Sequence, residues 1–176
     1  MLYIDLPTRN ELTDLSGKRA DACVSIYVKT TPVTTETQAS RIELGNLIRE
    51  AQNQLEEAGF DKRRMATLME SLRDLLDDGQ FWRFQANSLA VFVTPDSIRS
   101  YRLPNDLTSM VQVSDRFHLK PLLRAVTFPH SGLVLALSEN AARLVEIHAD
   151  MAPGKVEVPD LPDSAADFAA KAAVSN

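Results

Sequence analysis

One uninterrupted apolar run constrains the fold of this chain more than any other feature. Residues 89–93, Leu-Ala-Val-Phe-Val, are consecutive and are followed by Thr94-Pro95. A run of this length that stops at a turn is typical of a strand buried on both faces of a sheet. The run therefore predicts the central strand of the fold.

Two further strands are predicted directly after this run. Pro95-Asp96-Ser97 has turn composition, because proline presets φ and the polar side chains bond to nearby backbone. Residues 98–103 alternate in the manner of a half-exposed strand, and Pro104-Asn105-Asp106 turns again. Residues 110–114 form a third short strand. Two close connections between consecutive strands predict an antiparallel meander.

A strand and two helices are predicted before the central run. Residues 22–29 alternate between an aliphatic face and a second face that carries Cys23. Apolar residues then recur at helical spacing over about 36–58 and again over about 61–77. Gly59 is placed to end the first helix, and Asp61 to cap the second. The short connection predicts a helical hairpin. We therefore expect an α/β fold with α+β character, in which a long helical hairpin covers a mixed sheet that contains the meander.

The remainder of the chain predicts a second, smaller part. A composition break at 127–131 is the best candidate for a domain boundary, which gives domains of 1–127 and 128–176. The second part is expected to hold a β-hairpin, a linker and an alanine-rich terminal helix. Its elements are a hairpin of strands 132–137 and 143–147, an optional strand at 155–158, a linker at 159–163 and the helix at 165–174.

Composition limits the classes of function. The 176 residues carry a net charge of -5, so no overall attraction to nucleic acid or to an anionic membrane is expected. The single cysteine excludes an internal disulfide and suits a reducing compartment. The apolar runs are far shorter than the ~20 residues of a membrane span, and the N-terminus lacks the composition of a signal peptide. The sequence thus predicts a cytoplasmic protein.

Motifs for cofactors and catalysis are weak. The six glycines form neither a dinucleotide-binding fingerprint nor a phosphate loop, and the three histidines lack metal-ligand spacing, so no cofactor and no metal are expected. Asp115 and His118 lie close to Ser114 in sequence, which raises a catalytic alternative. Residues of these types at a turn between a strand and a helix are more commonly caps and hydrogen-bond partners.

The helical hairpin carries the cations that are the candidates for binding RNA. Lysine and arginine on helices usually solvate an outer face, and interleaved glutamates dilute the positive field. Both interpretations stay open from charge alone. The candidate residues are Arg41, Arg49, Lys62, Arg63 and Arg64.

Several strings in the chain resemble the bacterial relatives of the archaeo-eukaryotic peptide-chain release factors. The strongest is 115–123, Asp-Arg-Phe-His-Leu-Lys-Pro-Leu-Leu, followed by 133–140, Leu-Val-Leu-Ala-Leu-Ser-Glu-Asn, and by Arg143-Leu144. Weaker agreement is found at 24–28, 41–51 and 100–104. The resemblance extends from about residue 20 to residue 162.

This resemblance implies an N-terminal α/β domain like that of release factors, followed by the opening hairpin of a domain with a ribonuclease H-like fold. Release factors hydrolyse peptidyl-tRNA through a Gly-Gly-Gln loop, and this sequence has no Gly-Gly-Gln. The nearest string, Asp78-Gly79-Gln80, has one glycine too few and lies in the first domain. No catalytic residue of the family is therefore carried over.

Two hypotheses follow. The first is a non-catalytic, release-factor-like module that binds the ribosome, tRNA or another RNA in translation or ribosome rescue. The alternative is a protein-interaction or structural domain with no RNA role, which self-associates or pairs with another chain through an open sheet edge.

Overall fold

A computed structural model describes residues 3–127, 131–138, 141–148 and 151–156, together with residues 158, 162, 164, 166 and 167. Contacts within the chain divide it into two compact units, Met1–Phe128 and Pro129–Asn176. Most of the predicted linker at 159–163 and of the predicted terminal helix at 165–174 lies outside the described residues.

The first unit is built on a four-stranded sheet in the order β3-β2-β1-β4. Strand β2 lies inside the sheet and every one of its residues is buried, as the apolar run predicts. Strand β1 pairs with it antiparallel, with Ile26 opposite Val91. The fold class, helices packed on a sheet, is thus confirmed. The strands are β1 (Cys23–Lys29), β2 (Ser88–Thr94), β3 (Ser97–Leu103) and β4 (Met110–Ser114).

The order of the strands corrects the predicted meander. Strands β2 and β3 form the expected hairpin, but β4 crosses the sheet and pairs with β1 instead of β3. All three described pairings are antiparallel, so the expected mixture of strand directions is absent from this sheet. The edge of β3 is occupied, because the backbone N–H of Asp5 donates to the carbonyl of Arg102 at 2.9 Å. Strand β4 instead pairs with β1, on the side of β1 that faces away from β2. Strand β1 is buried from Cys23 to Val28.

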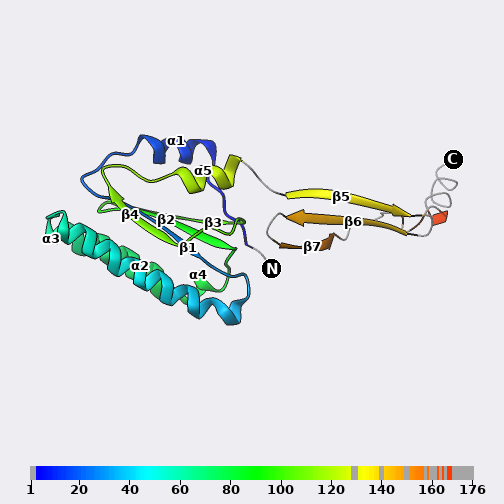
Figure 1. Ribbon diagram of the computed structural model, residues 1–176, viewed down its shortest axis with the longest axis horizontal. Coiled ribbons are helices and arrows are strands. Elements are labelled where there is room, and N and C mark those ends of the chain that lie inside the picture. Colours follow the sequence, from blue (N-terminus) through cyan, green and yellow to red (C-terminus); the bar gives the residue numbers. More distant parts are fainter. Residues whose placement is uncertain are drawn as a thin grey trace. The chain divides into compact units, whose positions relative to one another are not determined.

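Helices cover both faces of this sheet (Figure 1). The α2–α3 hairpin packs on one face, where Val24, Ile26 and Val91 meet its leucines in the larger core cluster. Helices α1 and α5 pack on the other face, over Tyr27 and Phe92. The helices are α1 (Arg9–Gly17), α2 (Thr37–Glu57), α3 (Lys62–Asp77), α4 (Gly79–Trp82) and α5 (Lys120–Thr127), with a 3₁₀ turn at η1 (Thr34–Glu36).

Local signals explain where the hairpin turns. Gly59 has a φ of 67°, a left-handed conformation that glycine adopts without steric cost. Asp61 then caps α3 by accepting from the backbone N–H of Arg64 at 2.9 Å. The predicted positions of this turn and this cap are confirmed.

The second unit contains a three-stranded antiparallel sheet in the order β5-β6-β7. The predicted hairpin is confirmed, and β7 extends it into a meander. The ribonuclease H-like domain that the resemblance implies stays a prediction. The strands are β5 (Ser131–Ser138), β6 (Ala141–His148) and β7 (Met151–Val156). None of the helices in the described part of the chain combines the length and apolar character needed to cross a bilayer.

Candidate functional site

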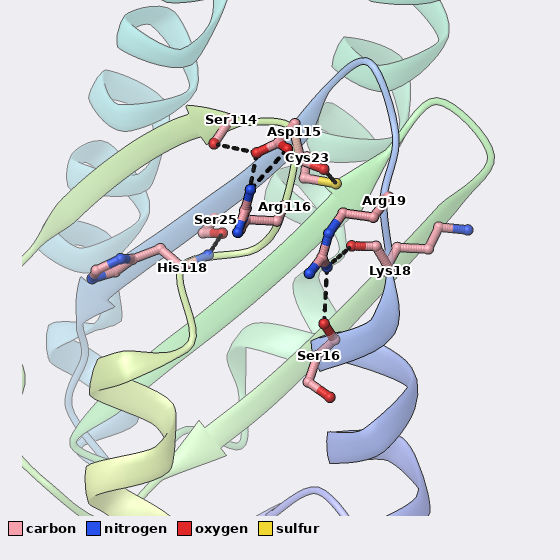
Figure 2. A network of polar contacts seen from close by, with 9 residues as sticks. All are labelled: Ser16, Lys18, Arg19, Cys23, Ser25, Ser114, Asp115, Arg116 and His118. Atoms are coloured by element: carbon pink, nitrogen blue, oxygen red, sulfur yellow. Dashed lines mark hydrogen bonds and ion pairs between the residues drawn. The ribbon is translucent and has the colours of Figure 1, made fainter.

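The turn between β4 and α5 places Asp115 in an exposed network of short-range contacts (Figure 2). Ser114 Oγ donates to Asp115 Oδ1 at 3.1 Å. The guanidinium of Arg116 binds both carboxylate oxygens, with Nε at 3.0 Å from Oδ1 and Nη2 at 3.1 Å from Oδ2. The hydrogen bonds from Arg116 first, and from Ser114 second, hold the pKa of Asp115 below its usual value. The Asp115 carboxylate is thus an anion that is bound by the two residues next to it in the sequence, Ser114 and Arg116.

His118 is held in the same turn by its backbone N–H and carbonyl groups. Its backbone N–H donates to Ser25 Oγ at 2.9 Å, and its carbonyl accepts from the Tyr27 hydroxyl at 2.7 Å. In Figure 2 the imidazole points away from the Asp115 carboxylate. Asp115 and His118 therefore lie in one turn, but their side chains do not contact each other as a catalytic base and the carboxylate that orients it would.

Cys23 lies beneath this turn and is fully buried. Its Sγ is 3.6 Å from the carbonyl oxygen of Asp115, which also accepts from the backbone N–H of Ala20 at 3.2 Å. Burial raises the pKa of the Cys23 thiol. Because the thiolate is the reactive form, this cysteine serves as a small packing group in the core.

We expect Cys23 to resist thiol reagents in the folded protein. In native buffer the release of thionitrobenzoate from Ellman's reagent should be slower than in denaturant by a factor of about 100 or more, because reaction requires opening of the core. The chain unfolded in urea provides the reference rate. Labelling in native buffer at the unfolded rate would contradict the burial of this thiol.

Three of the five predicted RNA-binding cations lie together at the start of α3. Lys62 and Arg63 are exposed. Arg64 already has intramolecular partners. Its Nη1 lies 2.5 Å from Asp21 Oδ2, and its guanidinium lies 5.4 Å from the centroid of the Phe60 ring. This end of the hairpin therefore offers Lys62 and Arg63 to a ligand.

The other two predicted cations lie elsewhere. Arg41 Nη2 donates to the carbonyl of Leu76 at 3.0 Å and ties the start of α2 to the end of α3. Leu76 is 14 residues from Lys62, about 21 Å along a helix. Arg49 is exposed on α2 and binds Asn46 Oδ1 at 3.1 Å. The five residues thus do not form a single patch.

Two segments of the first unit differ in charge. Residues 36–78, which include the hairpin, hold six Lys and Arg against ten Asp and Glu, a net charge of -4. Residues 97–127, which include α5, hold five against two, a net charge of +3. The cations of that second segment were not among the predicted positions. Counting charge by segment would have signalled them.

A half-open hollow of about 530 Å³ lies beside the C-terminal half of α1. Lys18 and Arg99 line it together with Phe92 and Phe117, and His118 is not among its lining residues. Within the described residues, no three His, Cys, Asp or Glu side chains gather as metal ligands.

Comparison with protein families gives a match to the C-terminal part of the chain. The family model described as Bacterial archaeo-eukaryotic release factor family 11 matches residues 129–176. This match confirms the predicted resemblance. No curated protein matches the sequence significantly.

Two solved structures resemble the chain at low identity. A chain described as an archaeal protein has a TM-score of 0.49 and 14% identity over 98% of this chain and 53% of its own length. The crystal structure of an archaeal translation termination factor has a TM-score of 0.45 and 14% identity, over 83% of this chain and 41% of its own. The chain thus spans about half the length, or less, of the solved structures it matches.

Proposed function

We propose, from the confirmed resemblance to the bacterial archaeo-eukaryotic release factors, that this chain is a non-catalytic module that binds the ribosome, tRNA or another RNA in translation or ribosome rescue. The match of the family model to residues 129–176 carries this proposal. In it, residues 1–127 are the release-factor N-terminal-like domain and residues 128–176 are the start of the second domain.

The start of α3 is the part of the hairpin best suited to contact phosphate. Lys62 and Arg63 are exposed there, at the positive end of a 16-residue helix dipole. Arg41, Arg49 and Arg64 remain candidates as well, although Arg41 and Arg64 must give up intramolecular contacts to bind RNA. We therefore place the primary RNA contact at Lys62 and Arg63.

We expect the purified chain to bind tRNA and ribosomes with an affinity that falls steeply as salt rises. The double variant Lys62→Glu/Arg63→Glu should weaken binding and reduce the slope of log affinity against log salt by about 2, one for each lost phosphate contact. Fluorescence anisotropy over a salt series measures both quantities.

The matched control is Lys120→Glu/Arg124→Glu, which makes the same change of charge on exposed positions of α5. An equal loss from both double variants would show that net charge governs binding, and would remove the assignment to the hairpin. No binding of either RNA at low salt would refute the proposed function.

The alternative function is a protein-interaction domain. Strand β5 supports it, because Leu133, Val134 and Leu135 are 63%, 44% and 51% exposed. Successive residues of a strand point to opposite faces, so both faces of the small sheet present apolar groups that a partner chain could cover. Under this alternative the chain binds no RNA even at low salt.

A further inference from the structure

Two exposed aromatic rings from distant parts of the sequence meet at one edge of the first unit. Tyr3 belongs to the N-terminal segment and Phe84 follows α4. They are 53% and 54% exposed, and their ring centroids lie 6.1 Å apart with an interplanar angle of 47°. The nearby Trp82 is 2% exposed and belongs to the core between the hairpin and the sheet, whereas Phe84 faces solvent.

The backbone fixes the position of Tyr3. Its N–H donates to the carbonyl of Gln85 at 3.3 Å, and two residues later the N–H of Asp5 donates to the carbonyl of Arg102 at 2.9 Å. The N-terminal segment thus runs along the outer edge of β3, as the blue ribbon in Figure 1 shows. The ring of Tyr3 is therefore held beside Phe84 before any ligand arrives.

An arginine supports the rings from the protein side. The Cζ of Arg102 lies 4.2 Å from the centroid of Phe81 and 5.0 Å from that of Tyr3, and its side chain is only 13% exposed. Its Nη2 donates to the carbonyl of Phe81 at 3.4 Å, and Asp5 lies 3.8 Å from its Nη1. The Arg102 guanidinium thus contacts the rings of both Phe81 and Tyr3. This contact holds Tyr3 in place while about half of the Tyr3 surface stays open to solvent.

A second arginine lies at the exposed side of the same group. The Cζ of Arg83 lies 6.0 Å from the centroid of Phe84, and the residue is exposed. The surface thus combines two solvent-facing π systems with a solvent-facing guanidinium. Aromatic rings stack on bases of any sequence, and guanidinium binds phosphate through paired N–H donors.

We propose that Tyr3 and Phe84 form a stacking platform for the unpaired bases of a single-stranded RNA segment, with Arg83 at the adjoining phosphate. This inference rests on the proposed function and deepens it by naming the form of RNA that this edge recognises. Single-stranded RNA is favoured over a protein partner because the exposed guanidinium of Arg83 lies beside the Phe84 ring. Lys62 and Arg63 contact the backbone by charge alone, whereas this platform reads the presence of bases.

The platform is tested by comparing how the full chain and its variants bind two RNA probes, one with bases and one without. The probes are a fluorescent oligoadenylate and an abasic strand of the same length, which keeps the phosphates and lacks the bases. The variants are Phe84→Leu and Tyr3→Leu, which retain an apolar side chain and lose the π face. We expect each to weaken oligoadenylate binding about tenfold, within the range for loss of one stacked base. Binding of the abasic strand and the salt dependence should not change.

Leu123→Ala is the matched control, because Leu123 is also exposed (46%) and lies on α5. Its affinity for oligoadenylate should equal that of the unmodified chain. The thermal midpoint of each variant confirms folding, and an exposed side chain should change it little.

Three outcomes would overturn the platform. Oligoadenylate affinity that changes by less than about twofold in both variants would leave this surface to a protein partner. An equal loss for the abasic strand would show that stacking is not involved. Absence of binding to either strand at low salt, when the chain does bind tRNA, would reject single-stranded RNA as the ligand. The last two results leave the proposed function standing, and only the loss of tRNA and ribosome binding as well refutes both.

Discussion

Replacement of Phe92 by alanine is expected to lower the free energy of unfolding of the first unit by about 3–5 kcal/mol. Phe92 is 1% exposed and lies at the centre of the core beneath α1 and α5. Its ring centroid is 5.8 Å from that of Tyr27, 6.2 Å from that of Tyr101 and 5.3 Å from that of Phe117. Removing the ring deletes all three contacts and leaves a cavity that rigid neighbours cannot close.

Urea unfolding followed by tryptophan fluorescence measures this loss. Trp82 is the single tryptophan, and it is buried in the core of the first unit, so its signal reports on that unit. Phe92→Leu should cost less than Phe92→Ala, because most of the apolar volume remains. A loss below about 1 kcal/mol for the alanine variant would show that this cluster contributes little to stability.

The sequence predicted the parts of the fold whose signals are local. The apolar run of 89–93 indicated a strand buried on both faces, and the alternation in 22–29 indicated its neighbour. Glycine at 59 and aspartate at 61 marked the turn of the hairpin because their physical roles need only a few adjacent residues. These features depend on sequence spacing alone, and the structure confirms them.

The position of β4 could not be predicted in this way. The connection at 104–109 is compatible with a meander or with a crossing to the far edge of the sheet. The outcome depends on which edge is free, and the N-terminal segment occupies the edge of β3 through the contact from Asp5 to Arg102. Residues nearly 100 positions apart therefore decide the strand order, and no local pattern records that competition.

The same limit applies to the candidate sites. The sequence named Asp115 and His118 because they are close along the chain, but the turn directs the Asp115 carboxylate to Arg116 and the His118 peptide to β1. Conversely, Tyr3 and Phe84 meet only in the folded chain. Proximity in sequence was a poor guide to side-chain contact at both places.

Ser25→Ala and Tyr27→Phe are each expected to lower the free energy of unfolding by about 1–3 kcal/mol, because each leaves one backbone group of His118, its N–H or its carbonyl, without its partner. Ser25 accepts from the N–H and Tyr27 donates to the carbonyl. Burial raises the pKa of Tyr27, so the phenol remains protonated and available as a donor at neutral pH. The two losses should not add in the double variant, because both bonds hold the backbone of the same residue.

His118→Asn is the deciding comparison, because it changes the imidazole and preserves the peptide that Ser25 and Tyr27 hold. We expect it to change the free energy of unfolding by less than about 0.5 kcal/mol and to leave tRNA affinity unchanged. Urea unfolding and anisotropy measure the two quantities. If His118→Asn abolished tRNA binding while stability stayed the same, the imidazole would have a role of its own, and the turn would be a functional site instead of a structural connection. If instead only the β1 variants have an effect, the geometry of this turn is held through its backbone, and His118 is one of several residues that could occupy it.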